Sequence, residues 1–255
     1  MEIRKGKALL DQIAFGRLRF FSRSKTELPQ VSLCSQEEEW LRFAQARRLA
    51  VLELAGLYDK AFEQVGAEVA AVFAIHAMLL EDEDLEDSVR TLIFDKNATA
   101  EYAVRLTGEG FYTTFAELDD PYMKARAADI RDLSRRVIRI LLGQEREDPF
   151  GGESAILVAD EFLPSEVMEL DRRYLLGLVS RRGSIDSHAA ILLRAYHIPV
   201  ITQVELDPCW DGHLALLDGF DGCLYLDPEE GLTDKLRERY QRGAGRKTEI
   251  GAITP

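Results

Sequence analysis

The sequence has few cysteines, no long apolar run and a shortage of basic residues, and each shortage argues against a class of protein. Cys34, Cys209 and Cys223 lie far apart and form no C-x-x-C pair, so a cysteine-zinc site or a disulfide framework is not indicated and three small buried thiols are expected. No apolar run approaches the roughly 20 residues of a membrane span. Residues 1–6 mix charges and lack the apolar centre of a signal peptide, so we expect a cytoplasmic protein that has no membrane partner.

The charge balance is strongly acidic. The chain has 45 acidic and 32 basic residues and a formal net charge of −13. Nucleic-acid binding depends on basic patches, so nucleic acid is not an expected partner. The charge suits either a basic partner or simple solubility, and composition alone does not choose between them. With 255 residues, 46% of them hydrophobic, the chain can form one large domain or two ordinary ones.

The order of sequence patterns predicts a helical domain inserted into an α/β domain. Residues 1–30 contain short apolar stretches typical of strands. A capping-box pattern at Ser35 opens a helical region that ends near Gly143, with Thr99 as a later cap and Pro121 as the first residue of another helix. Consecutive amphipathic helices with short connections predict an antiparallel bundle.

After residue 144 short apolar runs alternate with a helical pattern, which indicates an α/β layer. The expected strands lie at residues 155–159, 175–179, 198–201, 214–217 and 223–226. We therefore expect an α/β domain built from residues 1–30 and 144–235, and a helical domain over 31–143. Residues 236–255 are expected to form a C-terminal helix or linker.

The most informative segment is 183–194, where His188 stands at the point where a short polar loop becomes an apolar helix. Gly183 and Ser184 keep this loop small beside a charged ligand. The unpaired N–H groups of a helix start can bind phosphate oxygens while the imidazole attacks phosphorus. The segment therefore predicts a phosphate carrier; the competing interpretation is a histidine that only caps the helix or lies on the surface.

The neighbours of His188 have less certain roles. Asp186 or Ser187 can cap the helix. The Asp186 carboxylate would repel a phosphate, or it could accept a ring N–H and leave the other ring nitrogen free to attack. Arg194 lies about 240° around the helix from His188, so we expect it to pack or form a salt bridge instead of binding phosphate.

An acidic segment follows an apolar group that includes Met78 and Leu79. Six of the seven residues from Glu81 to Asp87 are acidic, and the seventh is Leu85. Carboxylates around apolar side chains suit docking of a basic partner, and methionine suits an adaptable surface. The alternative is a solvated turn between two helices.

The remaining polar features are predicted to be structural. Arg126, Asp129 and Asp132 follow one another at three-residue spacing, and such helical pairs are mostly solvated. His197 and His213 fall in loops or at strand edges and are assigned no role.

Two segments resemble the N-terminal half of Enzyme I of the bacterial phosphotransferase system. One runs from His76 to Leu85 and continues at residues 126–132; this pattern is specific to Enzyme I. The other is Ser187-His188-x-Ala190-Ile191, which also occurs in other swivelling domains of phosphoenolpyruvate-using enzymes. The resemblance implies an α/β phosphohistidine swivelling domain with an inserted all-α helical bundle that docks the partner.

The resemblance also implies roles for residues. His188 would take phosphate from phosphoenolpyruvate as tele-phosphohistidine and pass it to HPr, a small phosphocarrier protein. The catalytic loop would consist of Gly183, Ser184, Asp186, Ser187 and His188. The HPr-binding residues would be His76, Met78, Leu79, Glu81, Asp82, Glu83, Asp84, Leu85 and Arg126.

The family's phosphoenolpyruvate and Mg²⁺ site lies in a C-terminal barrel. A barrel needs about 200 residues or more, and this sequence ends at Pro255. We therefore expect no cofactor in this chain and no use of phosphoenolpyruvate by the chain alone. Reversible exchange of phosphate with phospho-HPr is still expected.

Two departures from the family pattern bear on His188. The usual Gly-Gly-x-Thr-Ser-His loop has Asp186 in place of threonine, and a family threonine that can hydrogen-bond the resting histidine is replaced by Leu163. Asp186 is our candidate to orient the ring instead, so Asp186→Asn should slow transfer.

Two alternative functions remain. One is the swivelling domain of a pyruvate phosphate dikinase or phosphoenolpyruvate synthase, which the helical insertion and the lack of an ATP-binding region disfavour. The other is a binding-only module.

Overall fold

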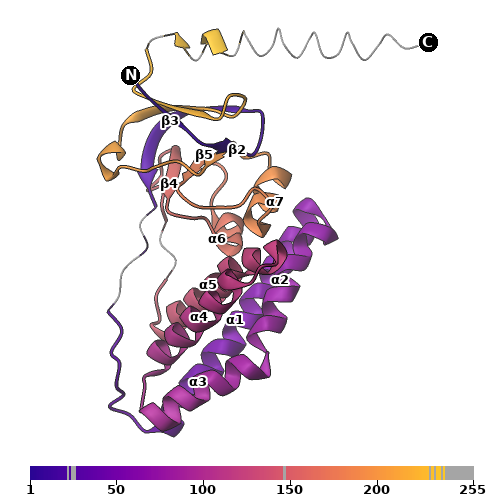
Figure 1. The fold of residues 1–255 in the computed structure, drawn as a ribbon, viewed down its shortest axis with the longest axis vertical. Coiled ribbons are helices and arrows are strands. Elements are labelled where there is room, and N and C mark those ends of the chain that lie inside the picture. The colour runs from indigo at the N-terminus through magenta and orange to yellow at the C-terminus, as the bar shows by residue number, and fades with distance from the viewer. Residues whose placement is uncertain are drawn as a thin grey trace, which may run out of the picture.

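The computed structural model joins a group of helices to a mixed β-sheet (Figure 1). It describes residues 1–21, 23, 27–145, 148–229, 231–232, 234–236 and 238. The helical part contains α1 (Gln36–Val65), α2 (Ala67–Leu80), α3 (Glu83–Lys96), α4 (Ala100–Glu117) and α5 (Pro121–Leu141). No helix in the described ranges combines the length and apolar character needed to cross a membrane.

The sheet collects strands from both ends of the sequence. Its strands are β1 (Glu2–Lys5), β2 (Lys7–Ala8), β3 (Ile13–Phe20), β4 (Ala155–Ala159), β5 (Leu175–Ser180), β6 (Val200–Thr202), β7 (Leu214–Asp218) and β8 (Cys223–Leu226). Their spatial order is β1-β8-β7-β3-β4-β5-β6-β2. The central β3, β4, β5 and β6 are parallel, and the outer pairs are antiparallel. The expected α/β fold, in which strands near the N-terminus pair with strands beyond residue 144, is confirmed.

Strand β4 shows why the sheet has a core on each face. All five of its residues are buried, and successive side chains of a strand point to opposite faces. Leu157 belongs to the core shared with the helices, whereas Ile156 and Val158 belong to a second core on the other face. A strand covered on both sides is continuously apolar, which is how this segment is recognised in the sequence.

Two short helices lie between the sheet and the long helices (Figure 1). Helix α6 (Pro164–Glu169) contacts α1 and α5, and α7 (His188–Ala195) contacts α2. The chain passes from β3 into α1 and returns from α5 into β4. This return places helices α2 and α5 beside the start of α7.

The local signals at the helix ends are confirmed. Ser35 and Glu38 form the expected capping box of α1, Thr99 caps α4, and α5 begins at Pro121.

The expectation of three buried thiols is wrong: Cys223 is buried, but Cys34 and Cys209 are exposed. Cys34 lies in the segment that joins β3 to α1, and Cys209 lies in the 3-10 helix η1 (Pro208–Trp210). Residues 239–255 of the expected C-terminal helix or linker lie outside the described residues.

Candidate functional site

His188 is the first residue of α7 and follows the loop after β5. Ser187 caps this helix: its hydroxyl accepts a hydrogen bond from the Ala190 N–H at 3.2 Å, and its carbonyl accepts one from Ile191 at 3.0 Å. Of the two caps that the sequence allows, Ser187 is the one used. The N–H groups of Ala190 and Ile191 are therefore bonded to Ser187 and are not among the free N–H groups of the helix start that could bind phosphate oxygens.

The loop before His188 has a defined shape. Gly183 has a φ of +137°, and a Cβ there would lie 3.0 Å from Thr202 Oγ1, so both backbone and space favour glycine. The Ser184 hydroxyl accepts a hydrogen bond from the Asp186 N–H at 3.1 Å. The Arg194 guanidinium donates to the carbonyl of Ile185, so Arg194 ties α7 to the loop, consistent with the expected packing role.

The imidazole of His188 meets a buried carboxylate from the helical part. Its Nδ1 lies 2.9 Å from Oδ2 of Asp129 on α5. The His188 side chain is 22% exposed and that of Asp129 is 2% exposed. On the other side of the carboxylate, Nε2 of the fully buried His76 on α2 lies 3.3 Å from Asp129 Oδ1. Three elements thus bring together a His–Asp–His cluster, which we define as His76, Asp129 and His188.

The charge of Asp129 fixes the role of the His188 ring nitrogens. Burial raises the pKa of Asp129, but the contacts with His188 and His76 outweigh this and leave the pKa below its usual value. Asp129 is therefore a carboxylate, which only accepts hydrogen bonds. Nδ1 of His188 must then carry the proton, so in the neutral ring Nε2 has the free electron pair. This is the tautomer that an attack by Nε2 requires.

The structure assigns the ring contact to a residue other than the one predicted. Asp186 is exposed, and the hydrogen bond to Nδ1 comes from Asp129 instead. Leu163 is buried and is the N-cap residue just before α6, and its apolar side chain gives the ring no hydrogen bond. The expectation that Asp129 and Asp132 are solvated is also wrong. Both are buried, and Asp132 accepts a hydrogen bond from the Ser165 N–H at 3.0 Å.

These corrections share a physical reason. Residues at three-residue spacing occupy neighbouring faces of a helix, but the spacing does not say whether that face meets solvent or another element. Helix α5 turns Asp129 toward α7 and Asp132 toward α6. One sequence signal could have identified Asp129: it is a carboxylate within the segment 126–132, which resembles a phosphotransfer protein.

The acidic segment forms an exposed helix junction. Asp82 caps α3 through the Asp84 N–H at 2.9 Å, and Glu81, Asp82, Glu83 and Asp84 are all exposed. Met78 on α2 is 71% exposed. Leu79, Leu85 and Arg126 are partly buried. Apart from Arg126 on α5, these predicted partner-binding residues are brought together around the junction.

His76 does not belong to that exposed set. It is fully buried, and its ring faces Asp129 and His188. Two residues along a helix rotate a side chain by about 200°, so Met78 points outward where His76 points inward. His76 therefore belongs to the His–Asp–His cluster in this structure, and its contact with a docked partner stays a prediction.

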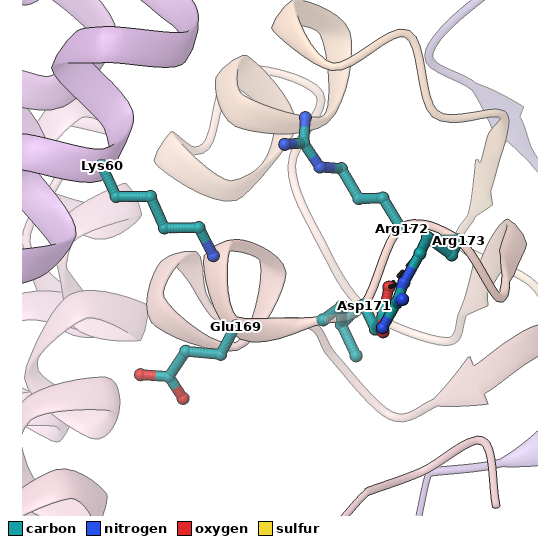
Figure 2. A pocket seen from close by; sticks show the side chains of 6 residues that line it. Lys60, Glu169, Asp171, Arg172 and Arg173 are labelled. Atoms are coloured by element: carbon teal, nitrogen blue, oxygen red, sulfur yellow. Dashed lines mark hydrogen bonds and ion pairs between the residues drawn. The ribbon is translucent and has the colours of Figure 1, made fainter. Parts of the chain in front are cut away.

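A shallow pocket lies at the other end of α7 (Figure 2). It is lined by Lys60, Glu169, Leu170, Asp171, Arg172 and Arg173. The Arg172 guanidinium stacks 4.2 Å from the ring centre of Tyr196, the residue that ends α7. Asp171 and Arg173 form an ion pair at 2.6 Å. An eight-residue helix is about 12 Å long, so this pocket is separate from the His188 site.

Two family models match the chain. The N-terminal part of phosphoenolpyruvate-utilising enzymes matches residues 5–126, and the mobile domain of these enzymes matches residues 151–222. Phosphoenolpyruvate-protein phosphotransferase of Bacillus sp. (strain S) is 32% identical over 84% of this chain and 37% of its own length. That of Bacillus subtilis is 29% identical over 98% of this chain and 44% of its own length. The chain thus spans about two fifths of these relatives.

Solved structures show the same fold over nearly the whole chain. A solution structure of Enzyme I (nEIt) superimposes with a TM-score of 0.69 at 27% identity, covering 94% of this chain and 99% of its own. A structure described as the N-terminal domain of Enzyme 1 - Nitrogen gives a TM-score of 0.59 at 28% identity, covering 95% and 99%. The likeness therefore includes both the helical part and the sheet.

Proposed function

The chain belongs to the phosphoenolpyruvate-utilising enzymes, with the fold of the N-terminal part of Enzyme I, and on this premise we propose that it is a phosphoryl-transfer protein of the sugar phosphotransferase system. His188 is the residue that carries the phosphoryl group. The observation that supports this role is the 2.9 Å contact between His188 Nδ1 and the buried Asp129 carboxylate. It holds the proton on Nδ1 and directs the electron pair of Nε2 away from Asp129.

The transfer step moves one phosphoryl group between two imidazoles. Nε2 of His188 attacks the phosphorus of a phosphohistidine on the carrier, the new N–P bond forms, and the N–P bond on the carrier breaks. The carrier imidazole leaves with the electron pair, and the reverse step runs the other way. As the His188 ring takes up phosphoryl, it becomes more positive, and the adjacent carboxylate stabilises that charge.

We assign docking of the carrier to the exposed helix junction. Glu81, Asp82, Glu83 and Asp84 offer four carboxylates around the exposed Met78, which suits a basic partner with an apolar centre. The carrier we propose is HPr. In this scheme residues 31–143 bind the carrier, while residues 1–30 and 144–235 present His188.

Use of phosphoenolpyruvate belongs to the remainder of the family enzyme. We assign phosphoenolpyruvate and Mg²⁺ to its C-terminal barrel domain and expect the protein to work in the cytoplasm. Within the described ranges, the one group of three close metal-ligating side chains is the His–Asp–His cluster. Mg²⁺ prefers oxygen ligands, and this cluster offers two imidazoles, so it does not suit Mg²⁺.

The test is transfer from phospho-HPr to the chain. The wild-type chain should gain acid-labile, base-stable phosphate, and His188→Ala should gain none. His213→Ala is the matched control, because His213 also contacts a carboxylate but is exposed, and it should label normally. Label that persists in His188→Ala would refute the assignment. No label on the wild-type chain would favour the binding-only module.

A further inference from the structure

His76 has the features of a ligand that lacks its ion. The residue is fully buried, yet neither ring nitrogen has a hydrogen-bond partner among the described residues. Nε2 lies 3.3 Å from Asp129 Oδ1 but is not aligned as a hydrogen bond. An imidazole buried without hydrogen bonds is costly, because its polar atoms lose water and gain nothing in return. The phosphotransfer step as described leaves His76 unused.

The surroundings of His76 already have the donor set of a transition-metal site. One ligand atom from each member of the His–Asp–His cluster lies within 4.8 Å of the others. The two imidazole–carboxylate separations are 2.9 Å and 3.3 Å. Ligand atoms around a tetrahedral zinc ion lie about 3.3 Å apart, given zinc–nitrogen distances of about 2.0–2.1 Å. The two contacts are made to different oxygens of Asp129, and the ligand atoms of the set lie within 4.8 Å of one another, so binding would draw them closer together.

The electrostatics of the cluster also favour a cation. Asp129 is 2% exposed and lies between two imidazoles, with its two carboxylate oxygens 2.9 Å and 3.3 Å from the nearest ring nitrogens. A dication among these three groups would be the counter-charge of a carboxylate that burial keeps from water. The side chain of His188 is 22% exposed, which leaves an entry path and a position for water.

We propose that His76, Asp129 and His188 bind a transition-metal dication, with Zn²⁺ as the fitting ion, and that metal binding inhibits phosphorylation of His188. Two imidazoles, one carboxylate and a water form a common zinc coordination. A neutral imidazole binds a metal through the nitrogen that carries no proton, so entry of the metal at His188 Nδ1 moves the ring proton to Nε2, and no electron is transferred. Nε2 then has no free electron pair with which to attack phosphorus. The inhibition, unlike the binding, rests on the proposed function.

The binding experiment titrates the whole chain with Zn²⁺ in a calorimeter and with Co²⁺ by visible absorption. A Cys34→Ser, Cys209→Ser background removes the two exposed thiols, which could bind metal by themselves. One ion per chain is expected. Because even indirect changes around a metal site cost about 10–100-fold in affinity, His76→Gln and Asp129→Asn should each weaken binding at least tenfold. His213→Gln, which alters an exposed histidine–carboxylate pair, should bind as the background does.

The outcomes separate this proposal from the function on which it builds. Thermal unfolding of each variant shows whether it is folded. Two different ligand residues are substituted, so the test can still be made if one of the variants does not fold. No one-to-one binding, or equal binding after His76→Gln, would overturn the metal site. Labelling by phospho-HPr is then measured with EDTA and with stoichiometric Zn²⁺; Zn²⁺ should slow it at least tenfold, and an unchanged rate would overturn the inhibition. Failure to label in EDTA would instead count against the proposed function.

Discussion

The chain contains two histidine–carboxylate pairs with nearly the same separation and very different surroundings. His188 Nδ1 lies 2.9 Å from Asp129, and His213 Nδ1 lies 2.8 Å from Asp227. The second pair joins residues 14 apart, one just before β7 and one just after β8, and its side chains are 47% and 57% exposed. The first joins residues 59 apart on different helices, around a carboxylate that is 2% exposed.

The contrast shows that a short distance alone does not identify a functional pair. In both pairs the histidine contact lowers the pKa of the carboxyl. At the exposed pair, water and salt replace most of the interaction when it breaks. At the buried pair neither is available, so the carboxylate holds the proton on one ring nitrogen. Exchanging matched substitutions between the pairs tests this difference.

The largest difference is expected between the rates at which Asp129→Asn and Asp227→Asn take phosphoryl from phospho-HPr. An asparagine can donate as well as accept, so it no longer holds the His188 proton on Nδ1. Positioned proton acceptors are worth roughly 100-fold or more in rate, and the single-turnover rate of Asp129→Asn should fall about that far. Asp227→Asn should react like the wild-type chain.

The control for this comparison is the dependence of the rate on pH. A loss that came from general damage to the fold would lower the rate equally at every pH. Loss of the correct tautomer should change the shape of the pH–rate profile. Equal rates for the two asparagine variants would show that the buried carboxylate does not position His188.

The second difference concerns stability in acid. Because the folded-state pKa of Asp129 is lowered, its contribution is present above the unfolded value of about 3.9 and is lost as the pH falls through the lower folded value. Each unit of difference is about 1.4 kcal/mol. The free energy of unfolding should therefore fall less between pH 5 and pH 2.5 in Asp129→Asn than in the wild-type chain.

Salt provides the comparison with the exposed pair. The measurement is repeated in about 0.5 M NaCl, where the screening length is only a few ångströms. The salt should remove any dependence of the free energy of unfolding on acid pH that is due to Asp227, and leave the part that is due to Asp129. Chemical denaturation at several pH values measures both. An acid dependence that is unchanged in Asp129→Asn would contradict the assignment of a buried, ionised carboxylate.

A smaller difference is expected between two glycines near the histidines. Gly183 and Gly212 both have positive φ, +137° and +80°. A Cβ at Gly183 would lie 3.0 Å from Thr202 Oγ1, whereas one at Gly212 meets nothing within 4 Å. Backbone strain costs roughly 1–3 kcal/mol, so both alanine variants should be less stable, Gly183→Ala by about 1 kcal/mol more. If the two variants lose equal stability in denaturant unfolding, the Thr202 side chain moves away from the new Cβ at no cost in free energy.

Much of the fold could be predicted from the sequence because its signals are local. The capping box at Ser35, the proline at residue 121 and the apolar run 155–159 each specify an element through nearby residues. The break in pattern near residue 144 also indicated that the N-terminal strands join a later sheet. The exposure of Cys34 and Cys209 could not be predicted, since the burial of a thiol depends on which distant segments pack over it.

The site could be predicted only in part, because its partners are distant in the sequence. His188 and its cap Ser187 follow from the local pattern of loop and helix. Asp129 and His76 are placed by the packing of α5 and α2 against α7, and periodicity gives the faces of a helix without saying which face meets which element. The sequence therefore indicated a carboxylate beside the His188 ring, but the role was assigned to Asp186, the carboxylate nearest in the sequence.

Asp186→Asn separates these two assignments and should have the smallest effect. Asp186 is exposed, and among the residues that the structure describes its hydrogen bond is made by its backbone N–H, to Ser184. Removing an exposed charge near a phosphoryl group changes the energy by less than about 1 kcal/mol after screening. The transfer rate should therefore stay within about fivefold of wild type, with any change in the direction of faster transfer, because one repelling charge is lost. A tenfold slower single-turnover rate would return Asp186 to the mechanism and would mean that the loop, as well as Asp129, orients the ring.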